Sequence, residues 1–215
     1  MVIHFTAMRS CKAAHDRLCD PAAEVSAHWL ISETGGVFAL VDEDRRAWHA
    51  GAGEWLGLGD VNSRSIGVEL ANDGISPFPE PQMAALERLL DGIMKRWDIP
   101  PASVIGHSDM APRRKIDPGP RFDWRRLACQ GLSVWPEPAL PGDFAADLRA
   151  FGYPDAPNLL DVFRLRFRPG ARGPLDDTDR ALAAGLDAAA RPAYPRPRAD
   201  GRMTAGATSR KVRTP

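Results

Sequence analysis

The chain has 215 residues, with 28 lysine or arginine and 28 aspartate or glutamate residues, so its formal net charge is zero. A balanced charge does not favour nucleic acid or an anionic membrane as partner, and we expect a substrate that is selected by local chemistry. The three cysteines form no CxxC pair, which disfavours a disulfide framework and a cysteine zinc knuckle. No apolar run approaches the roughly 20 residues that cross a bilayer, and the opening residues lack a secretory pattern. We therefore expect no membrane span, with a cytoplasmic location as the sequence stands and a periplasmic one if the N-terminus is truncated.

Predicted strands and helices alternate along residues 1–135. Apolar or β-branched runs predict strands at 2–6, 26–32, 37–42, 65–71 and 104–106, and ETGG at 33–36 has the chemistry of a hairpin turn. A serine cap opens a helix at 10–18, and a short helix is expected at 123–129. Apolar residues recur at intervals of three and four along 80–97, which predicts a helix with one buried face. The order indicates an α/β (α+β) domain with a mixed central sheet flanked by helices.

The remainder of the chain changes in composition. Residues 136–142 form a linker rich in proline and glycine, and amphipathic segments follow at 143–151, 158–167 and 177–186. They predict a small helical domain at 143–190. The tail, 191–215, is rich in proline and arginine and has too few apolar side chains to offset the entropy of ordering, so we expect it to be disordered.

Three segments bring a potential metal ligand to a strand end or a stiff loop. They are VIH ending at His4, IGH ending at His107, and KID ending at Asp117. A catalytic zinc site needs three histidine or carboxylate ligands and an open fourth position for water. Two distant histidines are weak evidence alone, because most histidines at strand ends are hydrogen-bonded structural residues. The run GHSDMAPRRKIDPGPRFDW at 106–124, however, places a histidine, a lysine and an aspartate in one loop stiffened by prolines.

Five segments resemble the type 2 N-acetylmuramoyl-L-alanine amidase family, which is related to phage T7 lysozyme and peptidoglycan recognition proteins. They are VIHFTA at 2–7, VSAHWLI at 25–31, LVDEDRRAWHAG at 40–51, SIGVEL at 65–70 and GHSDMAPRRKIDPGP at 106–120. The resemblance is greatest to AmiD-type members, and it implies a Zn²⁺-dependent hydrolase acting in cell wall degradation or recycling. The bond cleaved would join N-acetylmuramic acid, in its ordinary or 1,6-anhydro form, to L-alanine in peptidoglycan or muropeptides. The C-terminal segments resemble the three-helix peptidoglycan-binding domain of AmiD-type members.

The resemblance also implies the roles of individual residues. By position, His4, His107 and Asp117 would bind zinc, Glu69 would be the general base, and Lys115 would steady the developing oxyanion. Zinc lowers the pKa of a coordinated water from 15.7 to roughly 7, so hydroxide would be available at neutral pH to attack an amide.

Structural, non-catalytic roles for two of these residues remain open. Glu69 lies in an apolar strand, where an unpaired carboxylate is costly, so it could instead pair with an arginine such as Arg64. Lys115 could be one more member of a solvated basic loop, because Arg113 and Arg114 precede it.

Further residues are predicted to contact the sugar or the peptide. His49, Trp55 and Asn62 are expected to line the substrate cleft, although Trp48 and Trp55 could equally belong to the core. The expected partners are muropeptides, bound by a monomer.

Two other functions are weighed against the zinc amidase. A non-catalytic peptidoglycan-recognition module of the same fold could lack the metal ligands, whereas the complete set is present here. A cysteine amidase would use Cys11 or Cys19 with His15, but neither thiol has a cationic setting that would favour the thiolate.

Overall fold

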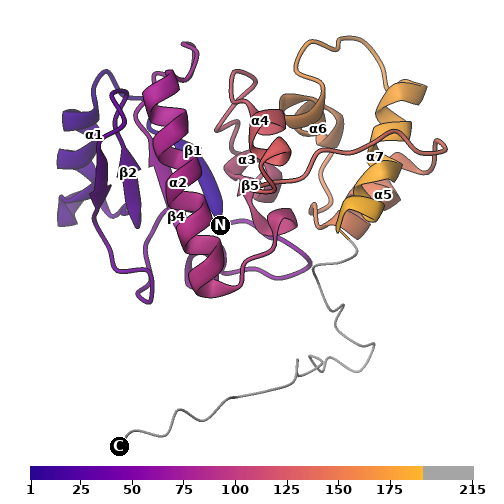
Figure 1. The fold of residues 1–215 in the computed structure, drawn as a ribbon. Coiled ribbons are helices and arrows are strands. Elements are labelled where there is room, and N and C mark those ends of the chain that lie inside the picture. Colours follow the sequence, from indigo (N-terminus) through magenta and orange to yellow (C-terminus); the bar gives the residue numbers. More distant parts are fainter. Residues whose placement is uncertain (191–215) are drawn as a thin grey trace, which may run out of the picture.

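One mixed sheet forms the centre of residues 1–190, the part of the chain that the computed structural model describes. Its strands are β1 (Val2–Phe5), β2 (Trp29–Ile31), β3 (Val37–Ala39), β4 (Gly67–Leu70) and β5 (Ile105–Gly106), in the order β3-β2-β4-β1-β5 (Figure 1). Strands β2, β4, β1 and β5 are parallel, and β3 pairs antiparallel with β2 through the predicted hairpin. The predicted fold class is thus confirmed.

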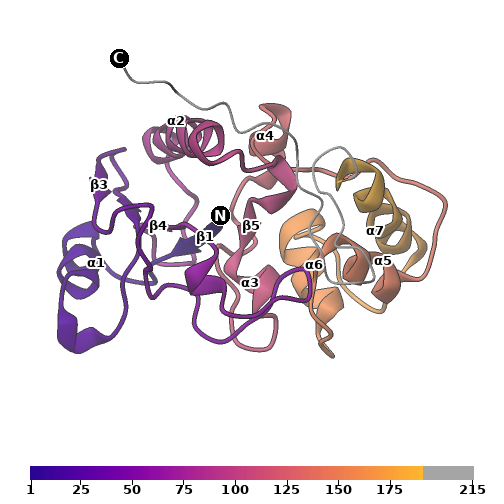
Figure 2. The same cartoon turned by 90° about the horizontal axis from the view of Figure 1, so that it is seen from below.

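Helices cover both faces of this sheet, and Figure 2 shows α1 (Cys11–Leu18) and α2 (Glu80–Trp97) on opposite sides of the strands. Helix α1 begins as expected, because the Ser10 hydroxyl accepts a hydrogen bond from Ala13 N. Helix α2 buries the face that its apolar spacing predicts, including Met83, Leu86, Leu90 and Ile93. Its apolar side chains pack against the sheet residues Ile3, Val68 and Leu70. The burial of this face therefore fixes the position of the central strands.

Short helical turns connect the strands and carry several site residues. They comprise the 3₁₀ turns η1 (Pro21–Ala23), η2 (Val61–Ser63) and η3 (Pro101–Ser103) and the helices α3 (His107–Met110) and α4 (Trp124–Cys129). Helix α3 follows β5 without an intervening loop, so His107 begins a helical turn at the strand end.

The C-terminal segments form α5 (Phe144–Phe151), α6 (Leu159–Phe167) and α7 (Asp177–Ala190), at the opposite end of the molecule from α1 (Figures 1 and 2). Leu148 and Phe163 of these helices belong to the same apolar cluster as Trp55, Ile105 and Met110. The helical segment thus shares a core with the sheet. The domain boundaries at 135 and 143 remain predictions, and the predicted disorder of 191–215 lies outside the described residues. Among the described helices, none combines the length and apolarity needed to span a bilayer.

Candidate metal centre and active site

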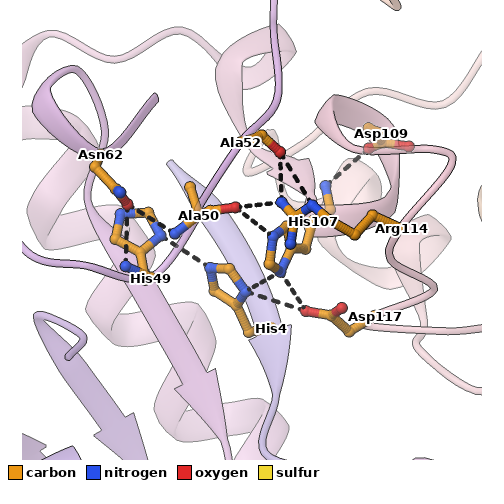
Figure 3. A network of polar contacts seen from close by, with 10 residues as sticks. His4, His49, Ala50, Ala52, Asn62, His107, Asp109, Arg114 and Asp117 are labelled. Atoms are coloured by element: carbon orange, nitrogen blue, oxygen red, sulfur yellow. Dashed lines mark hydrogen bonds and ion pairs between the residues drawn. The ribbon is translucent and has the colours of Figure 1, made fainter. Parts of the chain in front are cut away.

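Three side chains from distant parts of the chain converge at one edge of the sheet (Figure 3). His4 lies near the end of β1, His107 directly follows β5, and Asp117 lies in the loop after α3. Because β1 and β5 are parallel neighbours, their carboxyl ends meet at this edge. His4 Nδ1 lies 2.9 Å from His107 Nδ1 and 3.1 Å from Asp117 Oδ2, and the latter two atoms are 3.0 Å apart. The ligand atoms predicted from the sequence are therefore brought together.

These atoms have the chemistry of a metal site. His107 Nε2 donates to Ala50 O at 2.8 Å, and His4 Nε2 lies 3.0 Å from His49 Nδ1, so each ring has a partner for a proton on its far nitrogen. With the protons there, two Nδ1 lone pairs and a carboxylate oxygen face one point, an arrangement that a cation stabilises. Four ligands at 2.0–2.1 Å around a tetrahedral zinc would be roughly 3.3 Å apart, close to the observed spacing. The donor set thus fits zinc.

Burial and charge keep His4 and Asp117 in the forms that a metal requires. Burial, with the nearby His107 ring, lowers the pKa of His4 to about 4, so its imidazole is neutral at pH 7. Burial alone would raise the pKa of Asp117, but hydrogen bonds with His107 and His4 outweigh that effect and hold it below its ordinary value. Neutral imidazoles and an ionised carboxylate are the metal-binding forms.

The segment from His49 to Ala52 contacts the rings of His4 and His107 at the nitrogen atoms that point away from Asp117. The His49 side chain contacts His4, and the Ala50 carbonyl accepts a hydrogen bond from His107 (Figure 3). Asn62 Oδ1 accepts from His49 N at 3.0 Å and from Ala50 N at 2.7 Å, which fixes the segment itself. The sequence predicts that His49, Trp55 and Asn62 line the substrate cleft. His49 does line the pocket. Asn62 is buried and does not line it, and its side chain accepts hydrogen bonds from the backbone of His49 and Ala50.

Glu69 and Lys115 share a pocket with the three ligands. The cavity is about 310 Å³, and its lining includes all five of these residues. Glu69 pairs with His4 in the sheet register, so both side chains emerge on the same face. Glu69 Oε2 is buried and has no hydrogen-bond partner, and within residues 1–190 no ion pair joins Glu69 to Arg64. The structure therefore gives no support to the ion-pair alternative.

The carboxyl group of Glu69 is strongly perturbed. Burial raises its pKa to about 8, with a further rise from the negative charge of Asp117 and a partial offset from Lys115. Glu69 Oε2 is a buried atom without a partner in the same cavity as the three candidate ligand atoms, and such an atom is unfavourable unless a ligand or ion compensates for it. This is the second observation that points to a cation and a water in the pocket.

The two tryptophans that the sequence left open occupy different environments. Trp55 is 8% exposed, packs edge-to-face on Phe151 and Tyr153 at ring distances of 5.7 and 5.3 Å, and lies outside the residues that line the pocket. Its position is that of a core residue, because its ring fills the junction with the C-terminal helices. Trp48 is instead 57% exposed and lines the pocket, as does Arg17. Neither Trp48 nor Arg17 was predicted to bind substrate, although Trp48 lies within the family-like segment at 40–51.

Comparisons with known proteins show the family to which the chain belongs. The model of the N-acetylmuramoyl-L-alanine amidase family matches residues 1–120. The amidase AmiD of Escherichia coli K12 is 33% identical over an alignment that covers 86% of this chain and 81% of that protein. Its solved complex with anhydro-N-acetylmuramic acid-L-Ala-D-gamma-Glu-L-Lys aligns with a TM-score of 0.78 at 33% identity, covering 86% of each chain. The structure of AMPDH3 from Pseudomonas aeruginosa with an anhydromuramic pentapeptide gives a TM-score of 0.79 at 31% identity, covering 87% of this chain and 90% of that one. The chain therefore belongs to the N-acetylmuramoyl-L-alanine amidase family.

Proposed function

We propose that this amidase hydrolyses the bond between N-acetylmuramic acid and L-alanine with a zinc ion held by His4, His107 and Asp117. The observation that carries the proposal is the convergence of these three donor atoms beside the partnerless carboxyl of Glu69 in one cavity. A zinc ion bound there supplies Lewis acidity, which acidifies water and polarises the amide carbonyl.

Glu69 and Lys115 have complementary positions for the reaction. Glu69 opens into the cavity beside His4, so its carboxylate can accept the proton of the attacking water and deliver it to the leaving alanine nitrogen. Burial raises the pKa of Glu69, so this carboxyl group holds a proton more readily than an exposed one, which suits the delivery of a proton to the leaving nitrogen. Lys115 lines the same cavity, where its ammonium group can stabilise the developing oxyanion, an effect worth roughly 3 kcal/mol for one donor.

The proposed substrates are small muropeptides that include the 1,6-anhydro form. The relatives in the two solved complexes hold an anhydromuramic tripeptide and an anhydromuramic pentapeptide, which supports this choice. An open rim with Trp48 and Arg17 supplies an aromatic face and a cation, which suit a sugar ring and the carboxylates of a stem peptide.

The test compares the wild-type protein with Glu69→Gln, which keeps the shape of the side chain but removes its basicity. Release of the L-alanyl peptide is measured by mass spectrometry, and bound zinc is measured by elemental analysis. We expect Glu69→Gln to retain zinc and to lose turnover by roughly 10²- to 10⁴-fold. Unchanged turnover would remove Glu69 from its role.

A second comparison tests the metal and the other functions that were weighed. Wild-type protein treated with a chelator should lose activity and regain it with added zinc. Activity that persists without metal, and disappears with a thiol reagent, would favour a cysteine amidase. Binding of muropeptides without any turnover would favour a recognition module.

A further inference from the structure

A buried ion pair connects the C-terminal helices to the turn that carries His107. Arg166 of α6 donates from Nη1 to Asp109 Oδ2 at 2.6 Å, and both side chains are 1% exposed. Tyr153, in the loop between α5 and α6, donates its hydroxyl proton to the other oxygen, Asp109 Oδ1, at 2.6 Å. Asp109 is therefore held at both oxygens by residues from the helical segment.

Asp109 in turn organises the turn that presents the ligand. Its Oδ2 accepts the backbone N–H of Gly106 at 2.8 Å, which closes the chain around His107. The next residue, Ser108, donates its N–H to the carbonyl of Asp117 at 2.9 Å. The turn from Gly106 to Asp109 therefore includes one ligand and contacts the backbone of a second.

Arg166 makes further contacts that restrain it from several sides. Its Nη2 donates to Val104 O, immediately before β5, and to Ser133 Oγ, both at 3.1 Å. Its guanidinium carbon lies 4.2 Å from the centre of the Trp124 ring. Helix α6 also lies beside α3 (Figure 2). The guanidinium thus fixes Asp109 relative to the strand that precedes His107.

Packing alone does not explain why charges occupy this position. A buried ion pair contributes little net stability compared with apolar residues of the same volume, because both groups lose their hydration. Two charge-assisted hydrogen bonds to one carboxylate do, however, fix its position and orientation. A shift of Asp109 would move His107, two residues earlier, out of line with the other ligands.

We propose that Arg166 and Tyr153 are positioning residues for the zinc ligand His107, acting through Asp109; this rests on the proposed zinc amidase function. The C-terminal helices are then part of the active-site framework, in addition to any contact they make with the cell wall.

The chain offers a matched control for Arg166 in the same helix. Arg164 is also buried and pairs with an aspartate, Asp179 of α7, with Nη2 to Oδ2 at 2.5 Å. It makes no contact with α3 among the hydrogen bonds of the described residues. Arg164→Gln and Arg166→Gln therefore each break one buried ion pair, but only the second releases Asp109.

The experiment uses the full chain and measures three quantities for each variant. They are the free energy of unfolding of the metal-free protein, the zinc dissociation constant by competition with a chromophoric chelator, and kcat and KM on a muropeptide. We expect both glutamine variants to be less stable. Only Arg166→Gln should raise the zinc dissociation constant, about tenfold, and lower kcat with KM within about twofold.

Tyr153→Phe keeps the proposal testable if Arg166→Gln does not fold, since it removes one oxygen atom. It should change zinc affinity and kcat in the same direction by about threefold, and Arg166→Lys should restore part of the Arg166→Gln loss. Zinc affinity and kcat at wild-type values in Tyr153→Phe and Arg166→Gln, or equal losses in Arg164→Gln, would overturn the positioning role. Absence of zinc and of turnover in the wild-type protein would instead overturn the proposed function itself.

Discussion

Gly67, the first residue of β4, has no side chain, and the His49 ring occupies the space where a Cβ would lie. A Cβ at this position would lie 2.3 Å from His49 Cγ and 2.6 Å from Nδ1, whereas carbon atoms pack at roughly 3.5–4.0 Å. The ring would therefore have to retreat by about 1 Å or more. Gly67→Ala is a steric change directed at one histidine, because Gly67 does not occupy the left-handed region of backbone conformation.

The size of the effect follows from the contacts of His49. A retreat of about 1 Å lengthens the present 3.0 Å contact between His49 Nδ1 and His4 Nε2 beyond hydrogen-bonding range. Loss of such a bond costs about 1–1.5 kcal/mol, which corresponds to a zinc dissociation constant raised roughly tenfold. Overpacking should also lower the free energy of unfolding by about 1–3 kcal/mol.

The assay is chelator competition for zinc, together with urea unfolding of the metal-free protein. Gly170→Ala is the control, because a Cβ there meets no atom within 4 Å and should change neither quantity. We expect Gly67→Ala to fold and to bind zinc about tenfold more weakly. If it binds zinc as tightly as the control does, His49 does not hold His4 in its metal-binding orientation, and the reasoning fails.

Three other predictions concern separate parts of the molecule. Asn62→Ala leaves two buried N–H groups without an acceptor, so it should lower the free energy of unfolding by about 2 kcal/mol or more and weaken zinc binding, as read by urea unfolding and chelator competition. Trp48→Ala removes an exposed aromatic face at the pocket, and kinetics should show KM raised severalfold with an unchanged melting temperature. Burial would raise the pKa of Asp179, but hydrogen bonds, chiefly from Arg164, lower that pKa overall. The ionised Asp179 therefore stabilises the fold fully above about pH 4, and this stabilisation is lost as the pH falls through the lowered pKa. Asp179→Asn should accordingly lower the free energy of unfolding by about 3 kcal/mol at pH 7, and the difference from wild type should shrink in acid titrations as the pH falls below the ordinary aspartate pKa of about 4.

Periodicity in the sequence predicted the elements that are held by one continuous apolar face. The helix at 80–97 is the clearest case, because each turn contributes a residue such as Leu86 or Leu90 to the same buried side. The same periodicity could not identify what a buried face packs against. The amphipathic spacing of residues 143–190 predicts a small helical domain, but it does not show that Leu148 and Phe163 lie in one apolar cluster with Ile105.

The candidate site was predictable only in part, for a related reason. Ligand motifs carry their chemistry in the residue itself, so His4, His107 and Asp117 could be named before their geometry was known, although their metal binding stays a proposal. A residue that only supports a ligand in the tertiary structure is not identified by a motif of this kind. Asn62 and Asp109 support the ligands through backbone contacts, and only the tertiary structure shows on which side of the ligands they lie.

The position of Glu69 shows how much depends on strand register. In the parallel pair β1–β4, His4 is opposite Glu69, so both side chains emerge on the same face of the sheet. A slip of one residue would place Val68 beside His4 and turn the carboxylate into the apolar layer under α2, since side chains alternate between faces. The buried apolar residues Val68 and Leu70 disfavour that slip, because it would turn them from the core towards the pocket. The core packing of the strands thus places the proposed general base beside the proposed metal site.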